Sequence, residues 1–456
     1  MVRPPSSSSQ LSTDQIRAFG QVLARTEWLS AEELQSYQAP LVSRLLLHAR
    51  KTTRFYRDRI DRDLSSIQRI REAWSEIPIL TRAEAVKNRL KLFSRKPPPI
   101  AGSVIEGATS GSTGAPFAFK KSAMSEAASI AFTERLYRWW SVNGEKSLAL
   151  IAPGRGIAPP PDGLTTHGWQ SSHTRGVRHL ISLDADIDTH LGWLVKRRPD
   201  YFGTYPPVLK ELARRTQGRG IDIRFALVLS FAAVLDEETR ALCRAVFSAE
   251  IADTYGAEEV GHIAAQCREC GEYHVSAEAT RVEVLDANGS AVSPGEIGKV
   301  VVTPLYNYAM PLIRYELGDM AEAGTIPSAC GRGLPTLRRI LGRYRNLFRY
   351  RDGSESWPIA PKFKLEDFIA LKHFQVVQID LDHIEIRYVP QDEDSDRPID
   401  LPALTQRVRA VLHQPVEVTV RRVAQIERSR GGKYEDCISL VPPASTRATH
   451  ESAAFW

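Results

Sequence analysis

The sequence predicts an α/β protein: a large domain with mostly parallel sheets flanked by helices, and a small α+β C-terminal domain. Between residues 147 and 254, short apolar runs alternate with helical segments, a pattern typical of largely parallel sheets. After Gly342, apolar and polar residues alternate instead, as in half-buried antiparallel strands. The 456 residues also exceed the usual size of a single hydrophobic core.

The N-terminal region is predicted to be helical. Ser12 with Gln15, and Ser30 with Glu33, have the spacing of a capping box at a helix start. Apolar residues at helical spacing then predict an amphipathic helix that ends near Phe55–Tyr56. These apolar residues are Leu41, Val42, Leu45, Leu46 and Ala49.

The α/β pattern of the large domain rests on three apolar runs and two helix starts. We expect strands at Ser147–Ile151, Phe225–Leu229 and Ile251–Thr254. One helix should begin after Pro206–Pro207, and another should have Asp236 as its N-cap.

The small domain is predicted from two alternating runs and one helix. Gln375–Leu381 and Ile384–Val389 should pair as antiparallel strands, and an acidic loop at Asp392–Asp396 should lead to a helix at Leu401–Leu412. A further alternating run, Val416 to Val420, predicts another strand.

We expect a division into two domains, residues 1–341 and 342–441, with a disordered tail at 442–456. Hydrophobic content of 43% and charged content of 25% are those of a globular protein. No apolar run is long enough for a membrane span, and Met1–Gln10 lacks the apolar core of a signal peptide. These features predict a cytoplasmic protein that does not bind membranes.

The net charge of +6 is mild, and arginines are interspersed with acidic residues. A nucleic-acid-binding protein would concentrate basic residues in a stripe with aromatics between them, so no nucleic-acid partner is expected. Excess arginine suits an anionic ligand such as a nucleotide or CoA, although a solvated basic surface explains most of it. The oligomeric state stays open, a homodimer included.

One glycine- and hydroxyl-rich segment stands out: Thr109, Ser110, Gly111, Ser112, Thr113 and Gly114. Glycines let backbone amides turn toward an anion, and hydroxyls add donors for phosphate oxygens. The segment lacks the Gly-Lys-Ser/Thr ending of a Walker loop. A flexible Gly/Ser linker is the alternative interpretation.

Four further segments follow in order: Asp253–Gly261, Pro311–Tyr315 with Gly318-Asp319, Gly342-Arg343, and Gly431–Lys433. Together with the Thr109–Gly114 segment, they resemble the adenylate-forming superfamily, in particular its phenylacetate–CoA ligase-like branch. The resemblance covers the chain from about Leu41 to Val441.

The resemblance implies a role for each segment. Thr109–Gly114 would hold the phosphates of ATP, and Glu259 would ligate Mg²⁺. Tyr255 and Gly256 would line the adenine and the carboxylate. Asp319 would grip the ribose hydroxyls, a task suited to a carboxylate that only accepts hydrogen bonds.

Two basic residues complete the implied site. Arg343 would contact the nucleotide from the hinge between domains, and Lys433 would bridge the carboxylate and the α-phosphate. A carboxylate that attacks a phosphate is an anion meeting an anion, so cations must neutralise both. Lysine is a mobile point charge on a flexible stem, which suits this task. The catalytic candidates are therefore Lys433 and Glu259.

The chain departs from the family pattern at four places. Glu258 stands where Ser or Thr is usual, Ala115 where many relatives have lysine, and Asn346 where a hinge aspartate is usual. Ala232-Ala233 occupies the position of a Gly-Glu pair. These departures leave open a slow, specialised or partly degenerate enzyme.

Five cysteines in a long chain argue against a disulfide framework. Cys267-x-x-Cys270, His274 and the distant Cys330 instead suit a tetrahedral Zn²⁺ site with a structural role. Members of the resembled branch can carry a zinc knuckle here. Reduced cysteines with a surface histidine are the alternative, and His262 is open to either packing or substrate contact.

The resemblance implies an acid–thiol ligase that uses ATP and Mg²⁺ to convert an aryl or arylacetic acid into an acyl-adenylate, with CoA as acceptor. The small domain would act as a lid that rotates between the two half-reactions. An amine or a carrier-protein thiol is the alternative acceptor, and a non-catalytic nucleotide-binding protein is the alternative of another class.

Overall fold

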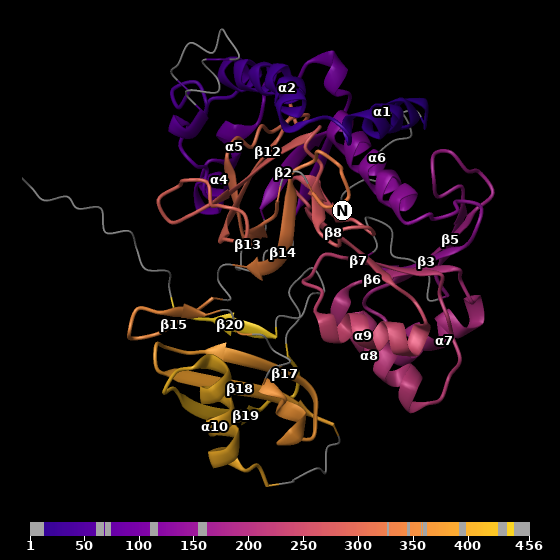
Figure 1. Cartoon of the computed structure of the whole chain (residues 1–456), viewed down its shortest axis with the longest axis vertical. Coiled ribbons are helices and arrows are strands. Elements are labelled where there is room, and N and C mark those ends of the chain that lie inside the picture. Colours follow the sequence, from indigo (N-terminus) through magenta and orange to yellow (C-terminus); the bar gives the residue numbers. More distant parts are fainter. Residues whose placement is uncertain are drawn as a thin grey trace, which may run out of the picture. The chain divides into compact units, whose positions relative to one another are not determined.

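The computed structural model describes residues 13–60, 68, 74–109, 117–153, 162–325, 328–343, 347–356, 358, 363–391, 398–426 and 436–441. The chain divides into two compact units, one that runs to Gly342 and one that begins at Arg343 (Figure 1). Several predicted features lie outside the described residues: Ser12, Ser110–Gly114, Ala115, Asn346, Asp392–Asp396, Lys433 and the tail. Among the described helices, none is both long and apolar enough to cross a bilayer.

The helices of the first unit are α1 (Thr13–Thr26), α2 (Ala31–Thr52), α4 (Arg82–Lys87), α5 (Arg89–Leu92), α6 (Ala123–Trp139), α7 (Ile187–Arg197), α8 (Pro206–Gly218) and α9 (Glu237–Phe247). The predicted Ser30–Glu33 capping box is confirmed, because Ser30 Oγ accepts from Glu33 N at 3.2 Å and Glu33 Oε2 accepts from Ser30 N at 2.8 Å. Helix α2 ends before Phe55, where a later end was predicted. The reason is Thr53, whose backbone is extended and whose hydroxyl donates to Ala49 O at 2.8 Å.

Twelve strands of the first unit form one sheet in the order β11-β12-β13-β14-β10-β9-β8-β7-β6-β3-β5-β4. Their bounds are β3 (Leu148–Ala152), β4 (Leu164–His167), β5 (Val177–Ser182), β6 (Tyr201–Thr204), β7 (Leu227–Phe231), β8 (Ile251–Ala257), β9 (Gly261–Gln266), β10 (Tyr273–Val275), β11 (Thr280–Leu285), β12 (Ile297–Pro304), β13 (Tyr315–Ala323) and β14 (Thr336–Arg343). The predicted α/β class, with a large sheet flanked by helices, is confirmed.

Parallel pairing is confined to one part of the sheet, whereas the sequence predicted that most of the sheet would be parallel. Strands β5, β3, β6, β7 and β8 pair in parallel with one another in this order, and β4 pairs antiparallel with β5 at the edge of the sheet. Strand β8 then pairs antiparallel with β9, because only the short turn 258–260 joins them and so short a connection permits only a hairpin. From this hairpin to β12, every pairing with a resolved register is antiparallel.

Helices α7, α8 and α9 lie together beside the parallel strands (Figure 1). The predicted helix starts are confirmed. Helix α8 begins at Pro206, and Asp236 caps α9 by accepting from Thr239 N at 2.6 Å. The strands predicted before and after these helices are present as β3, β7 and β8.

The second unit has its own core of buried residues around Phe348, Phe363 and Ile386. It contains β15 (Phe348–Arg349), β16 (Glu355–Ser356), β17 (Leu371–Gln378), β18 (His383–Pro390), α10 (Leu401–Leu412), β19 (Glu417–Arg422) and β20 (Cys437–Ser439). Its four-stranded sheet has the order β19-β18-β17-β20. The predicted antiparallel pair β17–β18 and the helix α10 are both confirmed.

Candidate functional site

The predicted phosphate segment connects the two strands of a hairpin, β1 (Val104–Ala108) and β2 (Ala118–Ser122). Thr109 and Phe117 tie the two ends of this connection together. Thr109 N donates to Phe117 O at 3.0 Å, and Phe117 N donates to Thr109 Oγ1 at 3.2 Å. Thr109 is therefore placed at the base of the connection, while Ser110–Gly114 lie outside the described residues.

Glu259, the predicted Mg²⁺ ligand, lies in the turn between β8 and β9, and its side chain is only 4% exposed. One carboxylate oxygen, Oε1, accepts from Arg82 Nη1 at 2.9 Å and from the Tyr315 hydroxyl at 3.0 Å. The other nitrogen of the same guanidinium, Arg82 Nη2, donates to Thr109 Oγ1 at 3.0 Å. A single arginine thus connects two predicted site residues from distant motifs.

Arg82 was not among the residues that the sequence indicated. It is the first residue of α4, whose start is fixed by a capping box between Thr81 and Glu84. Two residues before Arg82, the backbone of Leu80 is bonded to the start of β13. Leu80 N donates to Arg314 O at 2.8 Å, and Glu316 N donates to Leu80 O at 3.0 Å. This backbone link brings Arg82 beside Tyr315. The Thr-x-x-Glu spacing could have placed α4, but no sequence signal links Arg82 to Glu259.

Two more predicted residues, Tyr255 on β8 and Asp319 on β13, are in direct contact. The Tyr255 hydroxyl donates to Asp319 Oδ2 at 2.8 Å, and both residues are buried. Gly256 is exposed on β8, and a Cβ there would lie 2.7 Å from Gly261 O, so the hairpin needs a glycine at this position. Arg343 is the last residue of β14 and the first of the second unit.

His262 is packed rather than exposed. Its Nδ1 is 3.0 Å from Ser276 Oγ, and its ring stacks on Phe132 with the centroids 5.7 Å apart. Burial, with a smaller contribution from the Arg135 charge, lowers the pKa of His262 to about 3. The imidazole is therefore neutral at physiological pH. It borders a cavity of about 10 Å³, which has room for one water-sized group.

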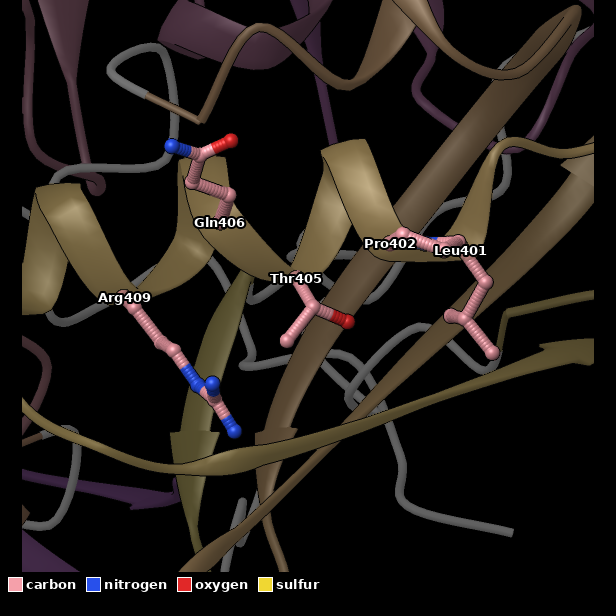
Figure 2. Close-up of a pocket in the computed structure, with 5 residues that line it drawn as sticks. All are labelled: Leu401, Pro402, Thr405, Gln406 and Arg409. Carbon is pink, nitrogen blue, oxygen red and sulfur yellow. The ribbon is translucent and has the colours of Figure 1, made fainter.

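A larger, open hollow of about 430 Å³ lies along α10 in the second unit. Figure 2 shows the side chains that line it, which come from this one helix: Leu401, Pro402, Thr405, Gln406 and Arg409. None of them is a predicted site residue, and Gln406 points away from Thr405 and Arg409 (Figure 2). The hollow therefore contributes nothing to the assignment of the site.

The four predicted zinc ligands do come together. Cys267 follows β9, His274 lies in β10 and Cys330 precedes β14, and with Cys270 their ligand atoms all lie within 4.8 Å of one another. His274 Nε2 is 3.2 Å from Cys330 Sγ and 3.6 Å from Cys270 Sγ. Tetrahedral zinc with its usual bond lengths would separate such ligand atoms by roughly 3.5–3.8 Å, so these donors fit the ion.

A buried arginine supports the same cluster. The Arg332 guanidinium donates to Cys267 Sγ at 3.5 Å and to Glu269 Oε2 at 3.2 Å. It also lies 5.0 Å from the ring centroids of both Trp28 and Trp139. Burial is outweighed at Cys330, where hydrogen bonds from Ser328 and Arg332 lower the pKa of the thiol, whereas burial raises the pKa of Cys267 and of Cys270. The thiolate, which is the form that binds zinc, is therefore favoured at Cys330, and the other two thiols would lose their protons when the ion binds.

No family model matches the chain. Two curated proteins are similar to the chain in sequence. Protein CapK of Staphylococcus aureus is 23% identical over 406 residues, which cover 86% of this chain and 86% of that protein. The phenylacetate-coenzyme A ligase of Thermus thermophilus is 26% identical over 272 residues, or 53% of this chain and 61% of that ligase.

Solved structures share the fold. A 2-hydroxyisobutyryl-CoA ligase in complex with R3-HIB-AMP has a TM-score of 0.71 at 17% identity, and the match covers 96% of this chain and 94% of that one. The amide bond synthetase McbA from Marinactinospora thermotolerans has a TM-score of 0.50 at 17% identity, covering 72% and 66%. The chain therefore has the fold of these ligases, and its sequence is similar to that of a phenylacetate-coenzyme A ligase.

Two departures from the adenylate-forming pattern have structural consequences. Ala232, directly after β7, has a φ of +71°, in the left-handed region that favours glycine. Ala232 thus adopts the left-handed backbone conformation that a glycine would adopt more easily. Glu258 is exposed whereas its neighbour Glu259 is buried, so the extra carboxylate does not share the environment of the predicted metal ligand.

Asp253, two residues before the Tyr255-Gly256-x-x-Glu259 motif, is buried and accepts from the Tyr273 hydroxyl at 2.6 Å. Burial raises the pKa of Asp253 to about 6, against an unfolded value of about 3.9. A raised folded-state pKa gives stability that is present below the unfolded value and is lost as the pH rises through 6.

We therefore expect Asp253→Asn to unfold at a higher temperature than the parent at pH 7, with a gain of about 1–3 kcal/mol because no charge is buried. The gain should shrink as the pH falls toward 4, where the parent carboxyl is protonated in the folded state and about half protonated in the unfolded state. Thermal unfolding from pH 4 to pH 8 measures this. A gain that does not change with pH would contradict the shifted carboxyl.

Proposed function

We propose that the chain activates a carboxylic acid with ATP and Mg²⁺ as an acyl-adenylate and then transfers the acyl group to the thiol of CoA. The observation that carries this proposal is the contact network of Arg82, Glu259, Tyr315 and Thr109. It joins the motif expected to hold phosphates to the motif expected to hold the metal. The Tyr255–Asp319 contact pairs the two residues expected at the nucleoside.

In the first half-reaction, a carboxylate oxygen attacks the α-phosphorus of ATP and pyrophosphate leaves. Lys433 would neutralise the two anions as they meet, and Asp319 would hold the ribose hydroxyls so that the α-phosphate is aligned. Bound Mg²⁺ would supply charge neutralisation at the phosphates. The Tyr315 hydroxyl, whose pKa is raised by burial and by the Glu259 charge, stays protonated and orients the Glu259 carboxylate.

In the second half-reaction, the acceptor attacks the acyl carbon and AMP leaves. The second unit, which begins at Arg343, would act as the lid that moves between the two steps. We take CoA as the acceptor because the curated relative with 26% identity is a CoA ligase. An amine is the second candidate, since a solved amide bond synthetase shares the fold. A carrier-protein thiol is a third.

We also propose a structural zinc ion held by Cys267, Cys270, His274 and Cys330. Four protein ligands leave no open coordination position, so the ion would stabilise the connection between β9, β10 and β14 without entering the reaction.

ATP–pyrophosphate exchange tests the proposal across aryl, arylacetic, hydroxy and fatty acids, each with and without CoA. We expect exchange with one class, aryl or arylacetic by the resemblance, followed by AMP release that depends on CoA. Exchange with AMP release only when an amine is added would establish the second candidate. Folded protein that binds ATP but exchanges with no acid would contradict adenylation and favour a non-catalytic nucleotide-binding protein.

A further inference from the structure

Two segments of the first unit, 51–58 after α2 and 87–96 around α5, lie against each other. Phe55 N donates to Lys91 O at 3.1 Å. Arg95 N donates to Thr52 O at 3.0 Å. The first segment exposes Lys51, Arg54 and Arg57. The second exposes Lys87, Arg89, Lys91, Arg95 and Lys96. We call these eight residues the basic patch.

The basic patch holds as much positive charge as the whole chain has in excess. Asp58 is the one acidic residue of the two segments, so together they carry +7, eight positive charges less one negative, whereas the entire chain carries +6. The rest of the chain is therefore close to neutral. The nearby ion pair of Arg59 with Glu84 leaves the eight residues without an acidic partner among the described residues. Such a local excess of one sign attracts an anionic partner.

An apolar side chain lies within this charge. Leu90 is 71% exposed, more than any other large apolar side chain of the described residues. Its neighbours in the sequence, Arg89 and Lys91, both belong to the basic patch. Leu92 of the same short helix is fully buried, which holds α5 to the core while Leu90 stays in water. An exposed leucine at such a place indicates a partner that also has an apolar layer.

The surroundings favour a membrane over a nucleic acid or a protein. Nucleic-acid binding needs aromatic faces for the bases, but Phe55 and Phe93 are half-buried and their rings lie 4.9 Å from the Arg59 guanidinium and 4.8 Å from Lys120 Nζ. A protein interface needs an apolar core, and the two segments expose one large apolar side chain. One leucine among many cations is enough for reversible attachment to anionic lipids.

We propose that the basic patch and Leu90 attach the protein reversibly to the surface of a membrane that contains anionic lipids. The lysines and arginines lie at the phosphate headgroups, and Leu90 enters the boundary between headgroups and acyl chains. The sequence prediction of no membrane contact depended on the absence of a long apolar run, which a peripheral surface does not need. This inference is independent of the proposed function, because it requires neither a nucleotide nor an acid.

The basic patch is near the candidate site. Helix α4 begins at Arg82, which contacts Glu259, and ends at Lys87 of the basic patch. Helices α4 and α5 lie beside each other (Figure 1). Six residues of α-helix span about 9 Å. Attachment would therefore hold the candidate site close to the headgroup layer.

Sedimentation of the full-length chain with lipid vesicles tests the proposal. Vesicles of phosphatidylcholine alone are compared with vesicles in which one third of the lipid is phosphatidylglycerol. We expect the parent to sediment with the anionic vesicles and not with the neutral ones, and the binding to weaken as salt is added. Each lost cation near the surface weakens binding roughly fivefold. The combined variant Lys87→Glu, Arg89→Glu, Lys91→Glu should therefore bind the anionic vesicles more weakly by a factor of roughly thirty or more.

Three further variants separate charge, apolar contact and position. Lys51→Glu, Arg54→Glu, Arg57→Glu changes the other segment by the same charge and should weaken binding to a similar extent. Leu90→Ser leaves the charge unchanged and should weaken binding about tenfold through the lost apolar contact. Lys196→Glu, Lys372→Glu, Arg421→Glu changes three exposed residues outside the basic patch and should bind like the parent.

Several outcomes would overturn the proposal. They are a parent that binds no vesicles, equal binding to neutral and anionic vesicles, and parent-like binding by either charge-reversed patch variant. Parent-like binding by Leu90→Ser would refute the membrane, because adsorption by charge alone would then explain the result. Double-stranded DNA is a further probe, and binding to DNA but not to vesicles would assign the basic patch to a nucleic acid instead. If one patch variant does not fold, the variant of the other segment decides.

Discussion

Lys433→Ala is expected to lower the rate of acyl-adenylate formation by a factor of about 10²–10³, the usual effect of removing one preorganised charge from a transition state. The attack joins two anions, and Lys433 is the residue that the family resemblance places between them. ATP–pyrophosphate exchange measures the loss. Lys433 lies in the sequence between β19 and β20, so the core of the first unit should keep its unfolding temperature.

The second half-reaction provides an internal control for this variant. When the acyl-adenylate is supplied ready-made, no carboxylate has to approach a phosphate, so thioester formation should be spared. Lys372→Ala removes an exposed lysine from β17 of the same unit and should leave both half-reactions intact. Normal pyrophosphate exchange by Lys433→Ala would end the role given to this lysine.

Cys267→Ser is expected to lose bound zinc and to unfold at a lower temperature than the parent. Cys267 is 1% exposed and is one of the four ligand donors, so the remaining three cannot complete a tetrahedral site. The lost metal should cost several kcal/mol, and each kcal/mol lowers the unfolding temperature of a large domain by about 2–4 °C. Elemental analysis and thermal unfolding measure the two changes on the same sample.

Cys243→Ser separates the metal effect from the burial effect. Cys243 is also fully buried, on α9, but it lies outside the cluster of four ligands. Serine there should lower stability through a buried hydroxyl while the zinc content stays at the parent level. If Cys267→Ser loses stability but keeps its metal, the zinc site is refuted and burial alone explains the result.

Local signals in the sequence predicted much of the fold. The Ser30 and Asp236 caps, the start of α8 at Pro206 and the helix α10 depend on contacts within a few residues, and all are confirmed. The extent of parallel pairing could not be predicted in the same way. It depends on the turn 258–260, which reverses the chain after β8, so that β8 pairs antiparallel with β9.

The residues of the candidate site also differ in whether local sequence signals or long-range contacts determine their positions. Motif order singled out Tyr255, Glu259 and Asp319. In the structure Tyr255 contacts Asp319 and Glu259 contacts Tyr315, while the nucleotide and metal roles of these residues stay predictions. The contact of Arg82 with Glu259 could not be predicted, because the two residues are 177 positions apart and no local sequence pattern links them. The cysteine cluster shows an intermediate case. Cys267-x-x-Cys270 is a local signal, but the convergence of Cys330 on it depends on the pairing of β10 with β14.

The left-handed backbone at Ala232 has a consequence for the evolution of this chain. Alanine at this φ costs roughly 1–2 kcal/mol in the folded state. Glycine would remove that strain and would lose about 0.5–1 kcal/mol through its larger entropy loss on folding. Glycine is therefore favoured over alanine by at most about 1 kcal/mol, whereas larger or β-branched side chains would cost more. The alanine is thus tolerated at a small loss of stability, which does not by itself indicate loss of function.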